Sequence, residues 1–152
     1  MRQLRKEKFQ ESEKLPGNNN MLTSPTNDFV IRIKNAANAR KLELSVPYSK
    51  AKLAIARVLV KEGYLSSAEK KQSSKESRES LICKINYWGN EPKIIGAKNI
   101  STPSLHIYKK VKEIKNSRKK FVTMIVSTSS GVMSGQEAIK KDLGGEIIAE
   151  IW

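Results

Sequence analysis

Four consecutive hydroxyl side chains, Ser127 to Ser130, limit what this chain can fold into more than any other feature of its sequence. They follow an apolar, strand-like segment, residues 121–126, and they end at Gly131. A buried strand would have to provide a hydrogen-bond partner for every one of these hydroxyls. We therefore expect a strand that ends at a surface contacting a partner rich in hydrogen-bond donors and acceptors.

The charge of the chain indicates what that partner is. The sequence of 152 residues has 29 Lys and Arg against 15 Asp and Glu, a formal net charge of +14. Such an excess favours a polyanionic partner, with RNA the leading candidate. The alternative is a basic protein without a polyanionic partner.

Cysteine content and hydropathy exclude several other classes of protein. The single cysteine rules out an internal disulfide and is typical of a reducing compartment. No segment approaches the roughly 18 apolar residues of a membrane span. The first 20 residues lack the apolar region of a secretory signal and contain three glutamates, which argues against a transit peptide.

The first half of the chain is predicted to mix helices and strands. Apolar residues at helical spacing predict a helix over 25–38, with Ser24 as its N-cap. A second helix is predicted to begin after Ser49 and to end at Gly63. Alternating residues predict a short strand over 42–46.

The second half is predicted to be mostly strand. Residues 66–79 lack hydrophobic periodicity and indicate a hairpin tip or a domain boundary. Ser80–Trp88 and Lys93–Lys98 are predicted to pair as a hairpin. The other predicted elements are strands over 105–108 and 119–126, a helix over 135–143 between an N-cap at Ser134 and a stop at Gly144, and a strand with Ile147, Ala149 and Ile151 on one face.

These elements predict an α+β fold, and the length of the chain fits one domain or two small ones. In a division into two, residues 21–78 would form an N-terminal α/β domain with two helices on a short sheet. Residues 79–152 would form a mainly β domain with one short helix. Residues 1–20 are predicted to be a tail-like extension, joined through a turn-rich linker that contains Pro16 and Gly17.

Residues suited to catalysis are few, and we expect no enzyme, metal or cofactor. His106 and Cys83 are the only histidine and cysteine, and each lies in a strand-like pattern. Glu146 and Glu150 would lie roughly 13 Å apart along one strand, too far for a pair of catalytic carboxylates. Gly144 and Gly145 follow a predicted helix and indicate a C-cap, since a phosphate loop would precede a helix.

Residues suited to RNA binding are abundant. Lys and Arg neutralise phosphates and supply affinity with little sequence information. One group surrounds the first two predicted helices: Arg32, Lys34, Arg40, Lys41, Lys50 and Lys52. Another precedes the predicted strand that ends at the hydroxyls of Ser127 to Ser130: Lys109, Lys110, Lys112, Lys115, Arg118, Lys119 and Lys120. Specificity would come from the hydroxyls, which match ribose 2′-OH groups and base edges. If Glu146 faces RNA, it would accept hydrogen bonds from base N–H groups; the alternative is an exposed charge at the start of a strand.

The order and spacing of six segments resemble the family of small-subunit ribosomal protein eight, in its bacterial and organellar form. The resemblance covers about residues 21–152. The segments are Asp28–Ala36, Val46–Lys50, Ile55–Tyr64, Ile100–Tyr108, Ser127–Met133 and Gly144–Glu146, the last near Trp152.

The resemblance implies two compact domains and direct binding to the central domain of small-subunit ribosomal RNA, early in assembly. It implies that the C-terminal domain recognises an irregular RNA helix and that the N-terminal domain contacts a second RNA segment. The implied primary contacts are Ser127, Thr128, Ser129, Gly131 and Glu146, with Ser130, Tyr108 and Lys109 expected at the same interface. The implied N-terminal contacts are Arg32, Lys34, Pro47, Ser49 and Lys50.

The chain departs from the family pattern near these residues. Ser130 stands where a basic residue is common, which removes one phosphate contact. Residues 116–120 are basic where a glycine-rich approach to the hydroxyl strand is usual. The other departures are Ile31, which replaces a usual threonine, and Asn99, Thr102, Ser104 and His106, which replace the usual Arg, Lys, Gly and Arg.

Three functions compete on this basis. The first is a structural component of the small subunit, with ribosomal RNA and neighbouring ribosomal proteins as partners and without a membrane or small-molecule substrate. It would lie in the cytoplasm of a bacterium or in the matrix or stroma of an organelle. The second is a translational repressor that binds messenger RNA through the same surface. The third is an enzyme with Ser129 or Cys83 as nucleophile, but neither residue has a plausible base beside it.

Overall fold

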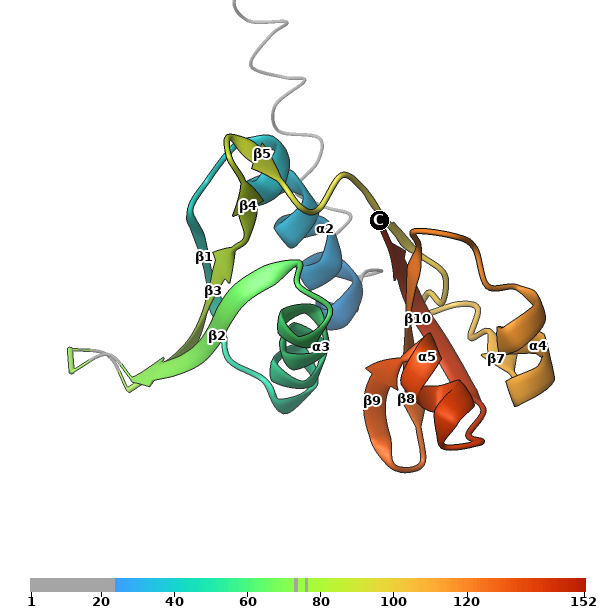
Figure 1. Ribbon diagram of the computed structural model, residues 1–152. Coiled ribbons are helices and arrows are strands. Elements are labelled where there is room, and N and C mark those ends of the chain that lie inside the picture. Colours follow the sequence, from blue (N-terminus) through green and yellow to red (C-terminus); the bar gives the residue numbers. More distant parts are fainter. Residues whose placement is uncertain (1–23, 73, 76) are drawn as a thin grey trace, which may run out of the picture.

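The computed structural model describes residues 24–72, 74–75 and 77–152, and Figure 1 shows two main antiparallel sheets with helices between and beside them. The helices are α2 (Pro25–Asn38), α3 (Lys50–Lys61), α4 (Val111–Asn116) and α5 (Gly135–Lys140). The strands are β1 (Glu43–Pro47), β2 (Leu65–Gln72), β3 (Glu79–Ile85), β4 (Tyr87–Trp88), β5 (Glu91–Pro92), β6 (Ala97–Asn99), β7 (Tyr108–Lys109), β8 (Thr123–Thr128), β9 (Gly131–Ser134) and β10 (Gly145–Ile151). The predicted α+β class is confirmed.

The first two helices form where the sequence predicts them. The hydroxyl of Ser24 caps α2 ahead of Pro25, and the hydroxyl of Ser49 caps α3. Gly63, with φ of +86°, ends α3 in the left-handed conformation that glycine adopts without steric cost. At the end of α2 the left-handed position is held by Arg40, with φ of 56°, which the sequence does not predict.

The first sheet has the order β1–β3–β2. The predicted pairing of Ser80–Trp88 with Lys93–Lys98 is wrong, because β3 pairs with β1 on one side and β2 on the other. The turn at Gly89 joins only the two-residue strands β4 and β5. Residues 66–72 belong to β2, an edge strand that ends in exposed polar residues, which explains why their sequence lacks hydrophobic periodicity.

The second sheet has the order β6–β10–β8–β9, with β7 also paired to β10. Its central strand β10 buries Ile147, Ala149 and Ile151, as the sequence predicts. The register with β8 shifts between Ile147 and Ala149, so a β-bulge interrupts the ladder there. Ile147 packs in a different cluster from the other two residues, and the prediction that all three share one face is therefore wrong.

Three other predicted elements differ from the structure. The strand over 119–126 begins only at Thr123, because Phe121 adopts a left-handed φ of 64°. The strand over 105–108 is reduced to β7, since Leu105 makes only an isolated bridge with Thr102. Helix α4 is not predicted because it buries a single side chain, Ile114, and so shows no hydrophobic stripe.

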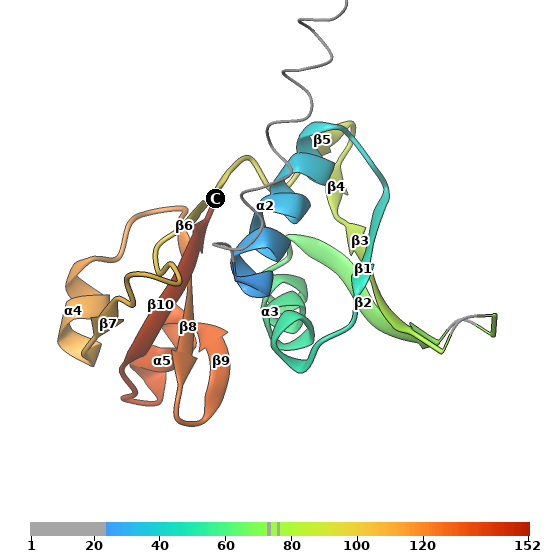
Figure 2. The ribbon, with the colours of Figure 1, turned by 180° about the vertical axis from the view of Figure 1, so that it is seen from behind.

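Helices α2 and α3 lie between the two sheets, as Figures 1 and 2 both show. One buried cluster extends from the first sheet through these helices to the second sheet and includes Leu81, Phe29, Leu59 and Ile125. A second cluster packs around Ile114 and joins α4 and α5 to β8 and β10. The two halves of the chain are thus held together by shared apolar burial, the main favourable term in folding.

The predicted domain boundary at 78/79 would cut the first sheet, because β3 belongs to it. The chain passes from the first sheet to the second only after β3. A division into two domains stays a prediction, and it would have to fall after residue 85. The predicted extension, residues 1–20, lies outside the described residues.

Candidate nucleic-acid interface

The hydroxyl run forms the tip of the β8–β9 hairpin. Thr128 pairs with Gly131, which leaves Ser129 and Ser130 in the turn between the strands. The Ser130 N–H donates to Thr128 Oγ1 at 3.1 Å, and this hydroxyl donates to the Gly131 carbonyl at 2.8 Å. In the part of the chain that the structure describes, the exposed hydroxyls of Ser129 and Ser130 have no hydrogen-bond partner. One predicted contact, Thr128, therefore holds the turn, while these two serines are available to a partner.

Glu146 lies beside the hydroxyl run although it is distant in sequence. Strand β10 pairs with β8 on one side and with β7 on the other, so Glu146 is opposite both Ser127 and Tyr108. Its Oε1 lies 2.7 Å from His106 Nδ1, and its side chain is 25% exposed. The fold thus brings the predicted hydroxyls and the predicted carboxylate to one end of the second sheet.

Gly144 and Gly145 allow the strands at this end to approach closely. A Cβ on Gly145 would lie 2.1 Å from the Ser127 carbonyl oxygen, and a Cβ on Gly144 would lie 2.7 Å from the Lys109 carbonyl oxygen. The predicted role of these glycines as the C-cap of α5 is wrong, because the left-handed position after that helix is held by Asp142, with φ of 56°. They serve the strand packing that holds Glu146 against Ser127.

A cavity of about 270 Å³ adjoins Ser127 and Glu146 and reaches the first turn of α2. Thr26 and His106 contribute polar groups to its lining. Ser101 also lines it and fixes the surrounding loop, since its hydroxyl accepts the Ile107 N–H at 3.0 Å. The sequence singles out His106 as the only histidine and as a departure from a family, without placing it beside Glu146, and it gives no role to Thr26 or Ser101. No local pattern signals them, because they meet through tertiary packing.

Tyr108 and Lys109 lie on β7 next to this site. The Tyr108 side chain is 69% exposed, a large aromatic surface open to a partner. Lys109 is half-buried and pairs with Gly145. The predicted contacts of the C-terminal half therefore gather around three strand ends.

The predicted contacts of the N-terminal half are less compact. Arg32 and Pro47 line a depression of about 320 Å³ between α2 and β1, and Arg32 pairs with Asp28 at 2.9 Å. The Ser49 hydroxyl is occupied by its capping bond, while Lys50 is exposed on the first turn of α3. Lys34 lies two residues beyond Arg32, about 200° around the helix, and so on a different face.

Comparison with known proteins identifies the family. Residues 24–152 match the family described as Ribosomal protein S8. The chain belongs to the ribosomal protein S8 family. Proteins named "Small ribosomal subunit protein uS8" are similar to it: that of Mycoplasmopsis synoviae (strain 53) is 40% identical, covering 86% of this chain and 98% of its own length. That of Persephonella marina (strain DSM 14350 / EX-H1) is 39% identical, covering 87% and 100%.

The S8 family is a structural family without enzymatic activity, and this chain is not an enzyme. The proposed nucleophile Cys83 is fully buried, and burial raises the pKa of its thiol to about 11. Among the described residues, no three His, Cys, Asp or Glu side chains gather in a group that could hold a metal ion. No helix in that part of the chain is long and apolar enough to cross a membrane.

The basic run of residues 109–120 lies over α4 and the loop that follows it. Its last residues, Arg118 to Lys120, approach the Thr123 end of β8, at the opposite end of the strand from Ser127. The sequence predicts that the run is a single phosphate-binding group. In the structure, Lys109 pairs with Gly145 at one end of the second sheet, whereas Arg118 to Lys120 lie near Thr123 at the other end.

Proposed function

We propose that this chain is a structural component of the small ribosomal subunit that binds the central domain of small-subunit ribosomal RNA and supports its assembly. Its partners are this RNA and neighbouring ribosomal proteins, in the cytoplasm. The RNA-reading surface, as we define it, comprises the exposed turn at Ser129 and Ser130 together with Ser127, Glu146 and Tyr108.

The observation that carries this proposal is the pairing of Ser127 with Glu146. It places a carboxylate, which only accepts hydrogen bonds when ionised, next to hydroxyls that donate and accept. A carboxylate would be repelled by phosphates, so its place in a basic protein indicates contact with base N–H groups. Hydroxyls beside it suit the 2′-OH groups of an irregular RNA helix.

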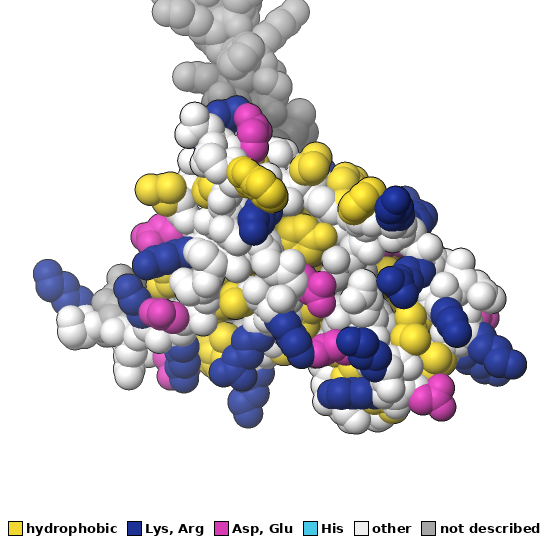
Figure 3. Space-filling model, viewed as in Figure 1, with side chains coloured by type: hydrophobic (Ala, Val, Ile, Leu, Met, Phe, Trp, Pro, Cys, Tyr) yellow, Lys and Arg dark blue, Asp and Glu magenta, His cyan; other side chains and the backbone are white. Residues whose placement is uncertain are grey.

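Affinity would come from the surrounding cations. Lys and Arg side chains are spread over both halves of the face shown in Figure 3 instead of gathering in one patch. Contacts with phosphates position a protein on RNA but carry little sequence information. Among the predicted N-terminal contacts, Arg32, Lys34 and Lys50 would hold the phosphates of a second RNA segment in this way, and Pro47 and Ser49 would lie beside it.

The test compares a central-domain ribosomal RNA fragment with a random RNA of equal length. The Ser129→Ala substitution removes a hydroxyl that has no hydrogen-bond partner within the described protein. We expect its loss to weaken binding to the central-domain fragment about fivefold, because a hydrogen bond contributes about 1 kcal/mol. Binding to random RNA should not change. Ser45→Ala, which removes an exposed hydroxyl from β1, is the matched control. Equal losses for both RNAs would contradict the assignment of Ser129 as a specific contact.

A further inference from the structure

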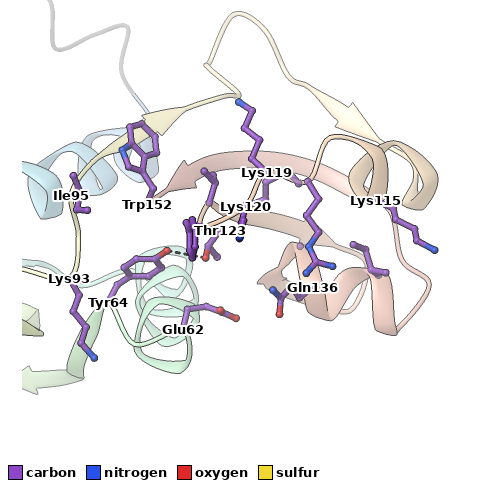
Figure 4. Close-up of a pocket in the computed structure, with 16 residues that line it drawn as sticks. Glu62, Tyr64, Lys93, Ile95, Lys115, Lys119, Lys120, Thr123, Gln136 and Trp152 are labelled. Carbon is purple, nitrogen blue, oxygen red and sulfur yellow. Dashed lines mark hydrogen bonds between the residues drawn. The ribbon is translucent and has the colours of Figure 1, made fainter.

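A second cleft, of about 840 Å³, lies at the opposite end of β8 and β10 from the RNA-reading surface. Its volume is within the roughly 300–1,000 Å³ of sites that enclose small organic molecules. Both halves of the chain line it, and the Tyr64 hydroxyl joins them, 3.1 Å from Thr123 Oγ1 and 3.3 Å from the Ile151 carbonyl oxygen. Figure 4 shows the contact between Tyr64 and Thr123, with Lys93 on one side and Lys119 and Lys120 on the other. We call this hollow the basic cleft.

The lining of the basic cleft is strongly cationic. Against one lining carboxylate, that of Glu62, the cleft is lined by five Lys or Arg residues: Lys93, Lys115, Arg118, Lys119 and Lys120. Lys119 is partly neutralised by Glu150, at 3.5 Å. Within the described residues, the other four have no acidic partner. The cleft therefore favours a polyanionic occupant.

Trp152 forms a fixed aromatic wall of the basic cleft. Its backbone N–H donates to the Gly96 carbonyl at 3.0 Å, and its carbonyl accepts the N–H groups of Ile95 and Gly96 at 2.7 and 2.9 Å. A Cβ on Gly96 would lie 2.6 Å from the indole, so the ring rests against the bare glycine backbone. The side chain is nevertheless 37% exposed. A ring held in place but still open to solvent suits stacking with a flat group.

Phe121 is another aromatic residue of the cleft and is more exposed than Trp152. Its side chain is 83% exposed, and its φ of 64° is unusual for a bulky side chain. Lys120 Nζ lies 5.2 Å from the centre of the ring. The left-handed backbone conformation at Phe121 costs free energy, and without a bound partner the exposed ring gains no burial that would offset this cost. Backbone strain of this kind concentrates at functional sites.

We infer that the basic cleft binds an unpaired segment of RNA, with bases stacked on both Trp152 and Phe121 and the flanking phosphates held by the Lys and Arg side chains. This inference rests on the proposed function, since it adds a second RNA contact to it. Cations combined with exposed aromatic rings are the usual composition of single-strand binding sites. An acidic protein segment would use the cations but has no base to stack on the rings, so RNA is favoured.

The probe is a ten-nucleotide oligouridine, too short and unpaired to reproduce an irregular helix. Trp88 is exposed, so fluorescence is read in a Trp88→Phe background in which Trp152 is the remaining tryptophan. We expect oligouridine to quench Trp152 emission, because a base stacks on the indole. Absence of quenching at saturating oligouridine would overturn the inference. So would binding of a ten-residue polyglutamate as tight as that of oligouridine, which would assign the cleft to an acidic protein partner.

Variants locate the binding. Trp152→Ala and Phe121→Gly should each weaken oligouridine binding about tenfold, from stacking energies of roughly 1–3 kcal/mol per base. Lys119→Gln with Lys120→Gln should lower the salt dependence by about 0.7 for each phosphate that the protein no longer neutralises. The matched control removes the same charge from the first sheet, Lys71→Gln with Lys84→Gln, and should leave stacking unchanged. Equal weakening by the control pair and by the cleft variants would overturn the inference.

The two RNAs separate this inference from the proposed function. Ser129→Ala should weaken binding to the central-domain fragment and leave oligouridine binding unchanged. If the central-domain fragment is not preferred over random RNA while oligouridine still quenches Trp152, the proposed function fails and the basic cleft stands as a general RNA site. If the preference is present and quenching is absent, only the inference fails.

Discussion

The two ends of strands β8 and β10 differ in chemistry although the same strands build both. At one end Ser127 pairs with Glu146, so that the exposed hydroxyls of the turn lie beside a partly buried carboxylate. At the other end Thr123 pairs with Ile151, next to Trp152 and a group of cations. The first end offers directional hydrogen bonds, whereas the second offers charge and aromatic surface.

This difference separates two parts of RNA binding that often occupy one surface. Hydrogen bonds to base edges and ribose discriminate between RNAs, while cations and stacking bind any strand. The two ends lie four residues apart along β8 and five residues apart along β10, which corresponds to roughly 13–17 Å of strand. One rigid sheet can therefore hold two RNA segments at a fixed distance, one by shape and one by charge.

The largest expected effect comes from the glycines that each end requires. Gly145→Ala would push a Cβ into the Ser127 carbonyl, and because backbone cannot move aside, we expect a loss of about 3 kcal/mol in the free energy of unfolding. Gly96→Ala would displace the Trp152 indole from its place against the glycine; a partly exposed side chain yields more easily than backbone, so the change should cost only about 1 kcal/mol. Urea denaturation followed by circular dichroism measures both. Equal losses in the free energy of unfolding would show that the two ends of the sheet are equally rigid and would contradict the difference between them.

Local signals in the sequence predict local structure well. The hydroxyls at Ser24 and Ser49 and the glycine at 63 mark the ends of α2 and α3, because capping depends on the residue itself and its near neighbours. Strand partners are not local. Nothing within β3 indicates that it joins β1 and β2 instead of the following strands.

The same difference between local and non-local signals applies to the candidate site. The turn at Ser129 and Ser130 and the carboxylate of Glu146 can be identified from the sequence, because these residue types are unusual at their positions. His106 cannot, since its 2.7 Å contact with Glu146 joins residues forty positions apart. The basic cleft is missed for a similar reason: Lys93, Lys119 and Trp152 line one cleft only after the two halves pack together.

The second expected effect separates stability from binding at the basic cleft. Phe121→Gly relieves a left-handed backbone strain of about 1 kcal/mol, but the added chain freedom of glycine costs about as much, so the free energy of unfolding should change by less than about 0.5 kcal/mol. Oligouridine affinity should nevertheless fall about tenfold. Calorimetric unfolding and fluorescence titration of the same samples measure the two quantities.

Asp142→Gly is the control for this substitution, because Asp142 has a similar φ, 56°, and lies outside the lining of the basic cleft. It should likewise leave stability nearly unchanged, and it should not reduce oligouridine affinity. If Phe121→Gly lowers stability by several times the change in Asp142→Gly, the phenyl ring has a structural role, and the contrast between a rigid polar end and an open aromatic end is weaker.

The smallest expected effect concerns how Glu146 is held. His106 contacts its carboxylate at 2.7 Å, so in His106→Ala the glutamate side chain must be ordered by RNA alone. Ordering one side chain costs roughly 0.5–1.5 kcal/mol, and we expect about threefold weaker binding to the central-domain fragment. Oligouridine binding at the other end should not change. If His106 instead competes with base N–H groups for the carboxylate, the same substitution would strengthen binding to the fragment. The change in affinity is measured at constant salt and pH. Weaker binding would show that His106 positions Glu146 for RNA, and stronger binding would show that His106 competes with RNA for the carboxylate.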